Sequence, residues 1–126
     1  MPLLYPDLSY DVVGAAIDVH QELGPGLLER VYREALCFEL RERGIPHASE
    51  VPIPVTYKGR PLGIGYQADI VVAEKIVLEL KVVNSFNSAH SAQLLTYMRL
   101  LKAGVGYLFN FKCANLVHQG RKRLIL

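Results

Sequence analysis

The amino-acid sequence predicts an α/β sandwich, in which helices pack on a mixed central β-sheet. Apolar residues recur at helical spacing in the first third of the chain, and short apolar or alternating runs typical of strands follow. A third helical stretch separates these strands from two more near the C-terminal end. With 126 residues, 51% of them hydrophobic, the chain is expected to form a single domain over residues 1–126.

Three helices are expected. The first runs from Ser9 to Leu23, and Ser9 or Asp7 is suited to cap it. A Gly-Pro-Gly turn ends this helix and opens the second, from about Leu27 to Arg43, which the glycine that follows Arg43 ends. The third helix spans about Asn87 to Lys102.

Five strands are expected, so that the elements follow the order α-α-β-β-β-α-β-β. The first strand is assigned to a sheet edge, because Pro52 and Pro54 cannot donate ladder hydrogen bonds. The second and third form a hairpin with Ala73-Glu74-Lys75 at its tip. The expected strands cover residues 50–55, 62–72, 76–83, 105–111 and 121–126.

Composition excludes few function classes. A net charge of +2 permits a nucleic-acid partner without arguing for one. Cys37 and Cys113 lie far apart in sequence, which indicates buried thiols in a reducing compartment rather than a disulfide framework or a zinc site. The N-terminal residues do not resemble a signal peptide, and no apolar run approaches the roughly 20 residues that a bilayer requires. A cytoplasmic protein without a membrane partner is therefore expected.

The most informative segment is the run from Ile76 to Val83, in which six apolar residues surround one acid and one base. Strand alternation places Glu79 and Lys81 on the same face of a strand apolar enough to be buried on both sides. Burial of an unpaired charge costs several kcal/mol. Glu79 and Lys81 therefore need partners, which are each other, a metal ion or a substrate.

The hairpin tip decides whether a second acid joins them. With a three-residue tip, paired residue numbers sum to 148, and Asp69 lies opposite Glu79 on the same face. A two-residue tip would turn Asp69 to the other face. In the first register two carboxylates lie about 5 Å apart at Cβ, which suits a hard cation such as Mg²⁺. The alternative is a Glu79–Lys81 pair at a sheet edge with Asp69 solvated.

The pattern Asp69…Glu79-Leu80-Lys81 resembles the D…(D/E)xK signature of the PD-(D/E)XK nuclease superfamily. The segment from Gly26 to Tyr32 is similar to the GxxExxY pattern of a family of small bacterial and archaeal proteins in that superfamily. The segment Gln93-Leu94-Leu95-Thr96-Tyr97 is similar to the QxxxY motif of its RecB-like branch. One position departs from the signature, because Ala68 stands where a proline often precedes the first aspartate. The resemblance implies a restriction-endonuclease-like core.

The resemblance also implies roles for individual residues. Asp69 and Glu79 correspond to metal ligands, with the Leu80 carbonyl as a third candidate. Lys81 would orient the attacking water or stabilise charge on the phosphate. Glu29 corresponds to the extra acid that a neighbouring helix brings to the metal. Its alternative role is an ion pair with Arg33, one helical turn further on.

Gln93 and Tyr97 lie one turn apart on the third helix, and His90 and Phe86 extend the same stripe. This stripe is a candidate substrate-binding surface, with Gln93 holding Lys81 or a phosphate. The alternative is a half-exposed helix face on which Tyr97 packs flat. No functional role is assigned to His20, for which packing is the favoured explanation, or to the basic run Arg121-Lys122-Arg123, for which protection of a strand end is favoured over contact with phosphates.

The resulting hypothesis is a nuclease that uses Mg²⁺ or Mn²⁺ to hydrolyse phosphodiester bonds, with DNA favoured over RNA as the substrate. The first rival is a catalytically silent module of the same fold that binds nucleic acid or protein. The second is a structural subunit, which arginines paired with Asp69 and Glu79 would indicate. The small size of the chain leaves a homodimer open.

Overall fold

The computed structural model of the protein describes residues 4–126. Its elements occur in the order α1 (Pro6–Leu23), α2 (Glu29–Glu42), β1 (His47–Tyr57), β2 (Arg60–Val72), β3 (Ile76–Lys81), α3 (Ser88–Leu101), β4 (Val105–Asn110), α4 (Leu116–Gln119) and β5 (Arg121–Ile125). The predicted α/β class and the order of the major elements are confirmed.

The five strands form one sheet in the order β1-β2-β3-β4-β5. β3 and β4 are parallel, and every other neighbouring pair is antiparallel. The sheet is therefore mixed, as expected, and α3 provides the crossover that two consecutive parallel strands require. β1 lies at the edge, where its two prolines remove no internal ladder bond.

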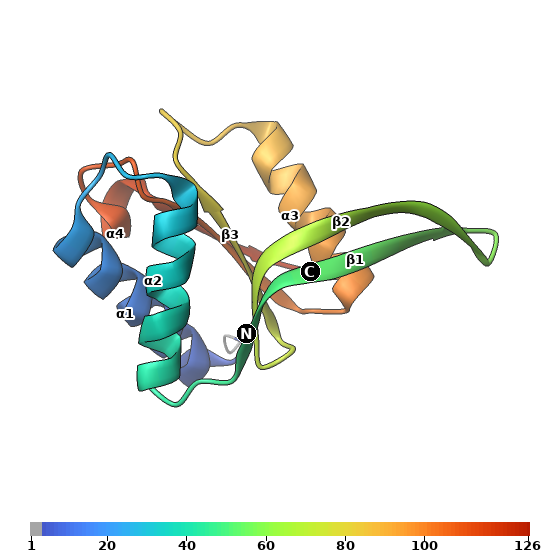
Figure 1. Ribbon diagram of the computed structural model, residues 1–126, viewed down its shortest axis with the longest axis horizontal. Coiled ribbons are helices and arrows are strands. Elements are labelled where there is room, and N and C mark those ends of the chain that lie inside the picture. The colour runs from blue at the N-terminus through green and yellow to red at the C-terminus, as the bar shows by residue number, and fades with distance from the viewer. Residues whose placement is uncertain (1–3) are drawn as a thin grey trace.

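Helices cover both faces of the sheet, as Figure 1 shows, with α1 and α2 on one side and α3 on the other. Two apolar clusters fill the two interfaces. The larger cluster joins α1 and α2 to the sheet through residues such as Val12, Leu36 and Leu78. The smaller joins α3 to the opposite face through Leu94, Met98 and Val77. β3 contributes to both clusters because alternate side chains point to opposite faces.

Several predicted boundaries are wrong. α1 begins at Pro6, and neither Ser9 nor Asp7 caps it, because Tyr5 occupies the N-cap position without a side-chain hydrogen bond. A proline in the first turn is a helix start in its own right, since its fixed φ suits the helix and its missing N–H would be unpaired there. α2 begins at Glu29, β1 extends from His47 to Tyr57, and the short helix α4 was not expected. No helix in the described part of the chain is long and apolar enough to cross a membrane.

Candidate functional site

The β2–β3 hairpin has the three-residue tip on which the position of Asp69 depended. Val72 pairs with Ile76, Val71 with Val77 and Ile70 with Leu78, so that each pair sums to 148. The predicted register is therefore confirmed. The ladder stops at Ile70 and Leu78, and the next residues in this register are Asp69 and Glu79.

Where the ladder stops, the two carboxylates accept hydrogen bonds from the backbone. The Asp69 N–H donates to the Glu79 carboxylate at 2.8 Å, and the Leu80 N–H donates to the Asp69 carboxylate at 2.8 Å. Each acid thus satisfies a backbone donor of the opposite strand. This reciprocal arrangement orients both side chains and holds them beside each other between the two strands.

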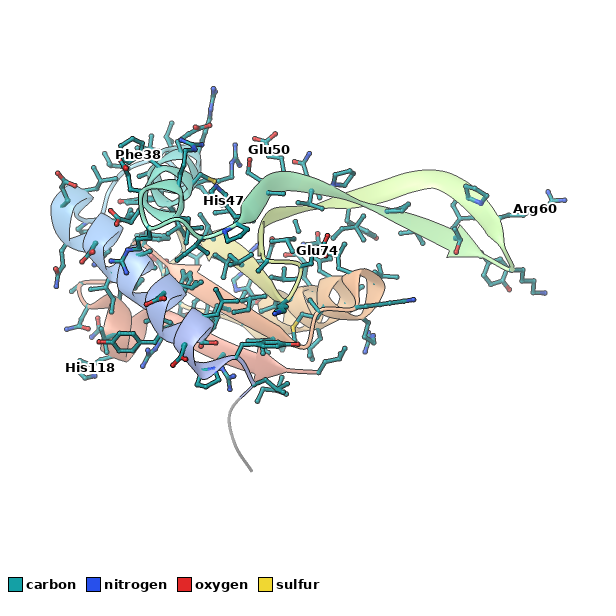
Figure 2. All side chains as sticks on the ribbon, turned by 90° about the horizontal axis from the view of Figure 1, so that it is seen from below. Phe38, His47, Glu50, Arg60, Glu74 and His118 are labelled. Carbon is teal, nitrogen blue, oxygen red and sulfur yellow. The ribbon has the colours of Figure 1, made fainter. Side chains whose placement is uncertain are left out.

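The backbone of β1 is distorted at the position opposite Asp69. Ser49 pairs with Ile70 and Val51 with Ala68, but the intervening pair of Glu50 with Asp69 is absent from the ladder. Glu50 has a φ of 51°, a left-handed conformation that L-residues rarely adopt. Its carboxylate pairs with Arg33 of α2 at 2.7 Å. Figure 2 shows Glu50 near α2, where the β1–β2 hairpin leaves the body of the protein.

Burial shifts the pKa of both acids in the same direction, upward. Burial raises the pKa of Glu79 to about 8, and the negative charge of Asp69 adds to the shift. Burial also raises the pKa of Asp69, against the hydrogen bond from the Leu80 N–H and the nearby charge of Lys81. Glu79 is only 4% exposed. Glu79 is thus a buried and Asp69 a half-buried carboxyl that resists ionisation, and a bound cation would favour the ionised form of both.

Lys81 lies beside the acids but its ammonium is held by another group. Its Nζ donates to the Gln93 side-chain oxygen at 3.1 Å, so that α3 fixes the end of this lysine. The salt bridges found in residues 4–126 involve Arg33 and Arg43, and none includes Asp69, Glu79 or Lys81. The alternatives of a Glu79–Lys81 ion pair and of arginines that neutralise the acids are therefore not observed.

Glu29 is the first residue of α2 and approaches the same acids from the other side. Burial raises its pKa, the charge of Asp69 raises it further, and Lys81 and Arg33 lower it. Arg33 forms its ion pair with Glu50 rather than with Glu29, so the predicted alternative partner is engaged elsewhere. The structure brings Glu29 within electrostatic reach of Asp69 and Lys81.

Tyr32 positions the loop that leads to Glu29. Its hydroxyl donates to the Gly24 carbonyl and accepts from the Leu27 N–H at 3.2 Å, which ties the two ends of the loop together. Its ring is fully buried and stacks on Phe111 with centroids 4.5 Å apart. The tyrosine of the GxxExxY pattern thus determines where α2 begins, and with it the position of Glu29.

The donor set suits a magnesium ion. Mg²⁺ keeps several waters and takes one or two protein carboxylates, which the Asp69–Glu79 pair provides. Within residues 4–126, no three His, Cys, Asp or Glu side chains form a preassembled metal-binding cluster. Glu29 therefore stands outside the pair, and Asp69 and Glu79 are the two acids that the structure brings together.

Gln93, His90 and Tyr97, the three predicted substrate-binding residues, lie in different surroundings. Gln93 holds Lys81, as described. His90 forms a capping box with Asn87 at the start of α3, in which its Nδ1 accepts from the Asn87 N–H, and its ring contacts Phe86 edge-on. Tyr97 is only 5% exposed, and the Tyr66 ring lies 5.8 Å from it. Tyr97 therefore belongs to the base of the site rather than to its surface.

His20 and the basic run, to which no functional role was assigned, make packing or surface contacts. His20 is buried, and its Nε2 hydrogen-bonds to the Cys113 carbonyl at 2.8 Å. In the basic run, Lys122 donates to Ser91 and Arg123 to the Leu4 carbonyl.

Sequence reasoning did not identify Asn110, which is buried and holds the segment that follows Lys81. Its side chain accepts from the Val83 N–H and donates to the Val83 carbonyl. The sequence feature that could have indicated Asn110 is its position as a polar residue at the end of the otherwise apolar strand β4. Tyr66 was also missed, because nothing local in the sequence indicates that it covers Tyr97.

Comparison with known proteins agrees with this geometry. The family model described as PD-(D/E)XK nuclease superfamily matches residues 6–124, nearly the whole chain. Searches among curated proteins and among solved structures gave no match. The matched span includes both sheet acids, the lysine beside them and the helices that flank them. The chain therefore belongs to the PD-(D/E)XK nuclease superfamily.

Proposed function

We propose that this protein is a nuclease that uses Mg²⁺ or Mn²⁺ to hydrolyse phosphodiester bonds, with DNA as the favoured substrate. The observation that carries the proposal is the Asp69–Glu79 pair, in which a half-buried and a buried acid lie side by side and neither forms a salt bridge among the described residues. Membership of the superfamily supports the reaction class.

Asp69 and Glu79 are the proposed metal ligands, with the Leu80 carbonyl beside them and Glu29 as an additional acid from α2. A divalent cation bound there would polarise the phosphate and lower the pKa of a water molecule. Since the Leu80 N–H already fixes the Asp69 carboxylate, the ligands need little reorganisation to bind. A cation bound there would also offset the negative charges that raise the pKa of Glu79.

Lys81 is the proposed catalytic cation. Its ammonium donates to Gln93 and forms no salt bridge with an acid among the described residues, so that the charge is available to the phosphate or to the attacking water. Gln93 and His90 are proposed to contact the substrate strand along α3. Tyr97, which is buried, is proposed to support Gln93 from beneath.

We also propose the finer assignment, to the GxxExxY family and the RecB-like branch. It rests on Gly26, Glu29 and Tyr32 in the first motif and on Gln93 and Tyr97 in the second. The contacts of Tyr32 and Gln93 support it. The Tyr32 hydroxyl accepts from the Leu27 N–H, and the Gln93 side chain accepts from Lys81, so that a residue of each motif has a structural role.

The test compares metal binding and cleavage in three variants. Asp69→Asn and Glu79→Gln are expected to lose both Mn²⁺ binding in calorimetry and cleavage of labelled DNA. Lys81→Ala is expected to retain Mn²⁺ binding and lose cleavage by a factor of at least about 100, as removal of one charge-stabilising group typically does. Lys75→Ala, which removes a lysine at the hairpin tip, is the matched control and should retain both. The proposal fails if the wild type with Mg²⁺ or Mn²⁺ cleaves neither DNA nor RNA and shows no heat of metal binding.

The second candidate is a module of the same fold that binds nucleic acid without turnover. The observation that favours it is that no three metal-binding side chains are preassembled within the described residues. Binding of Mn²⁺ and of DNA without cleavage would select this candidate. Sedimentation at micromolar concentration would establish at the same time whether the protein forms a homodimer.

A further inference from the structure

The β1–β2 hairpin extends beyond the sheet as a two-stranded arm, here defined as residues 51–68. β2 pairs with β3 only from Ile70 to Val72, so that β2 pairs with β1 alone along the whole of the arm. Figure 1 shows the arm projecting past the helices, and Figure 2 places Arg60 at its far end. An isolated two-stranded ribbon is marginally stable in water. The projection therefore requires an explanation.

The arm carries positive charge and exposed aromatic side chains. It contains Lys58 and Arg60 at its turn and no aspartate or glutamate from Val51 to Ala68. Tyr57 is 62% exposed and Tyr66 50% exposed. Basic and aromatic side chains together match a nucleic acid, whose phosphates attract the former and whose sugars and bases contact the latter.

The base of the arm is attached to the proposed active site. Ile53 is buried in the cluster of α3, and the Tyr66 ring packs against Tyr97, one turn from Gln93 on that helix. On the other side, Arg33 of α2 holds Glu50, which directly precedes the arm. The direction of the arm is thus set by the two helices that bring Gln93 and Glu29 to the site.

The free edges of the arm argue against a second copy of the chain as the occupant. Addition of a strand requires a row of unpaired backbone donors, and Pro52, Pro54 and Pro61 each remove one. The pairing register also shifts between Pro54 and Thr56, which interrupts the regular edge. The ribbon is of a size that the major groove of B-form DNA admits.

We propose that the arm binds a DNA duplex and that Lys58 and Arg60 contact backbone phosphates away from the cleavage site. The proposal rests on the proposed function for the position of the scissile phosphate at Asp69. Arg60 lies nine positions before Asp69 along β2. At about 3.3 Å per residue the arm spans at most about 30 Å, or roughly nine base pairs of duplex.

The test measures binding to a 30-base-pair duplex in EDTA, where turnover does not occur. Lys58→Gln/Arg60→Gln is compared with the wild type and with the control Arg41→Gln/Lys102→Gln, which removes the same charge from the ends of α2 and α3. The slope of log affinity against log salt is expected to fall by about 1.8 in the tip variant, because each phosphate contact contributes about 0.9. Between 50 and 200 mM salt the wild type then loses about tenfold more affinity than the tip variant. The stretch of duplex that the protein protects from hydroxyl radicals should be shorter at one end with the tip variant than with the wild type.

Equal slopes for the tip variant and the control would overturn the proposal, as would the absence of DNA binding by the wild type. A change in sedimentation of the tip variant with unchanged DNA affinity would assign the arm to a second copy and would also overturn it. Failure of the nuclease proposal is distinguishable, because it would appear as absent cleavage in Mg²⁺ or Mn²⁺ while the tip dependence of binding remained.

Discussion

At the scale of single residues, the site combines groups that a folded core normally avoids. Glu79 is buried and Asp69 is half-buried beside it, and the hydrogen bonds that they accept come from backbone N–H groups rather than from cations. These bonds favour the ionised forms, whereas burial and repulsion favour the protonated forms and prevail. The metal-free site is therefore unstable in its fully charged state.

This conflict predicts a pH dependence of stability in the absence of metal. The folded-state pKa of Glu79 is about 8, above its ordinary value of 4.5, so its proton is bound more tightly in the folded state. Its stabilising contribution is complete below about pH 4.5 and is lost as the pH rises to about 8, by an amount on the order of a few kcal/mol. Urea denaturation in EDTA at pH 5 to 8 should show this decline, and Glu79→Gln should flatten it. An equal decline in Glu79→Gln would refute the assignment, because the four histidines are common to both proteins.

At the scale of elements, loops position the acids more than the strands do. The tip of the β2–β3 hairpin is a tight turn in which the Lys75 N–H donates to the Val72 carbonyl at 2.9 Å. Ala73 and Glu74 both have positive φ, of 50° and 60°, which is the pattern of a type I′ turn. Alanine and glutamate are poorly suited to these conformations, so the turn retains strain.

Ala73→Asn/Glu74→Gly is therefore expected to stabilise the protein by about 1 kcal/mol, since this pair suits a type I′ turn and keeps the loop length. Chemical denaturation measures the change. Glu34→Gly, which makes the same glutamate-to-glycine substitution inside α2, should instead destabilise by about 1 kcal/mol. A loss of stability in the turn variant would contradict the assignment of strain to this turn.

The loop before α2 gives a second prediction at this scale. Tyr32→Phe removes the hydroxyl that joins Gly24 to Leu27 but keeps the ring stacked on Phe111. The expected cost is about 1 kcal/mol of stability, together with weaker Mn²⁺ binding because Glu29 is less well positioned. Calorimetry and denaturation test both effects. Tyr107→Phe, a buried tyrosine on β4, is the control and should leave Mn²⁺ affinity unchanged.

The sequence was sufficient to predict the elements that follow from hydrophobic periodicity and from local turn chemistry. The apolar run around Glu79 identified β3, and the three-residue tip identified the register that aligns Asp69 with it. The full length of β1 was not predictable, because Ala48, Ser49, Thr56 and Tyr57 at its two ends are exposed and give no apolar alternation. The ion pair between Arg33 and Glu50 and the contact of Tyr66 with Tyr97 join elements far apart in sequence, and no local pattern reports them.

At the scale of the whole molecule, metal binding and folding should be linked. A cation that binds only the folded state stabilises it by about 2.7 kcal/mol at a concentration of 100 times its Kd. For a chain of this length, that corresponds to an increase in Tm of about 10 °C. Thermal denaturation with Mn²⁺ should show the increase in the wild type, and Asp69→Asn/Glu79→Gln should not respond. An equal increase in both proteins would place the metal elsewhere.

The shape of the molecule also bears on how such a protein evolves. Among the arm residues whose side chains the structure describes, those between Pro54 and Gly65 belong to neither apolar cluster, whereas the site acids lie between the two. Substitutions in the outer arm therefore leave the folding of the core largely untouched. Selection can then alter the proposed DNA-binding arm while the residues of the proposed metal site are inherited unchanged.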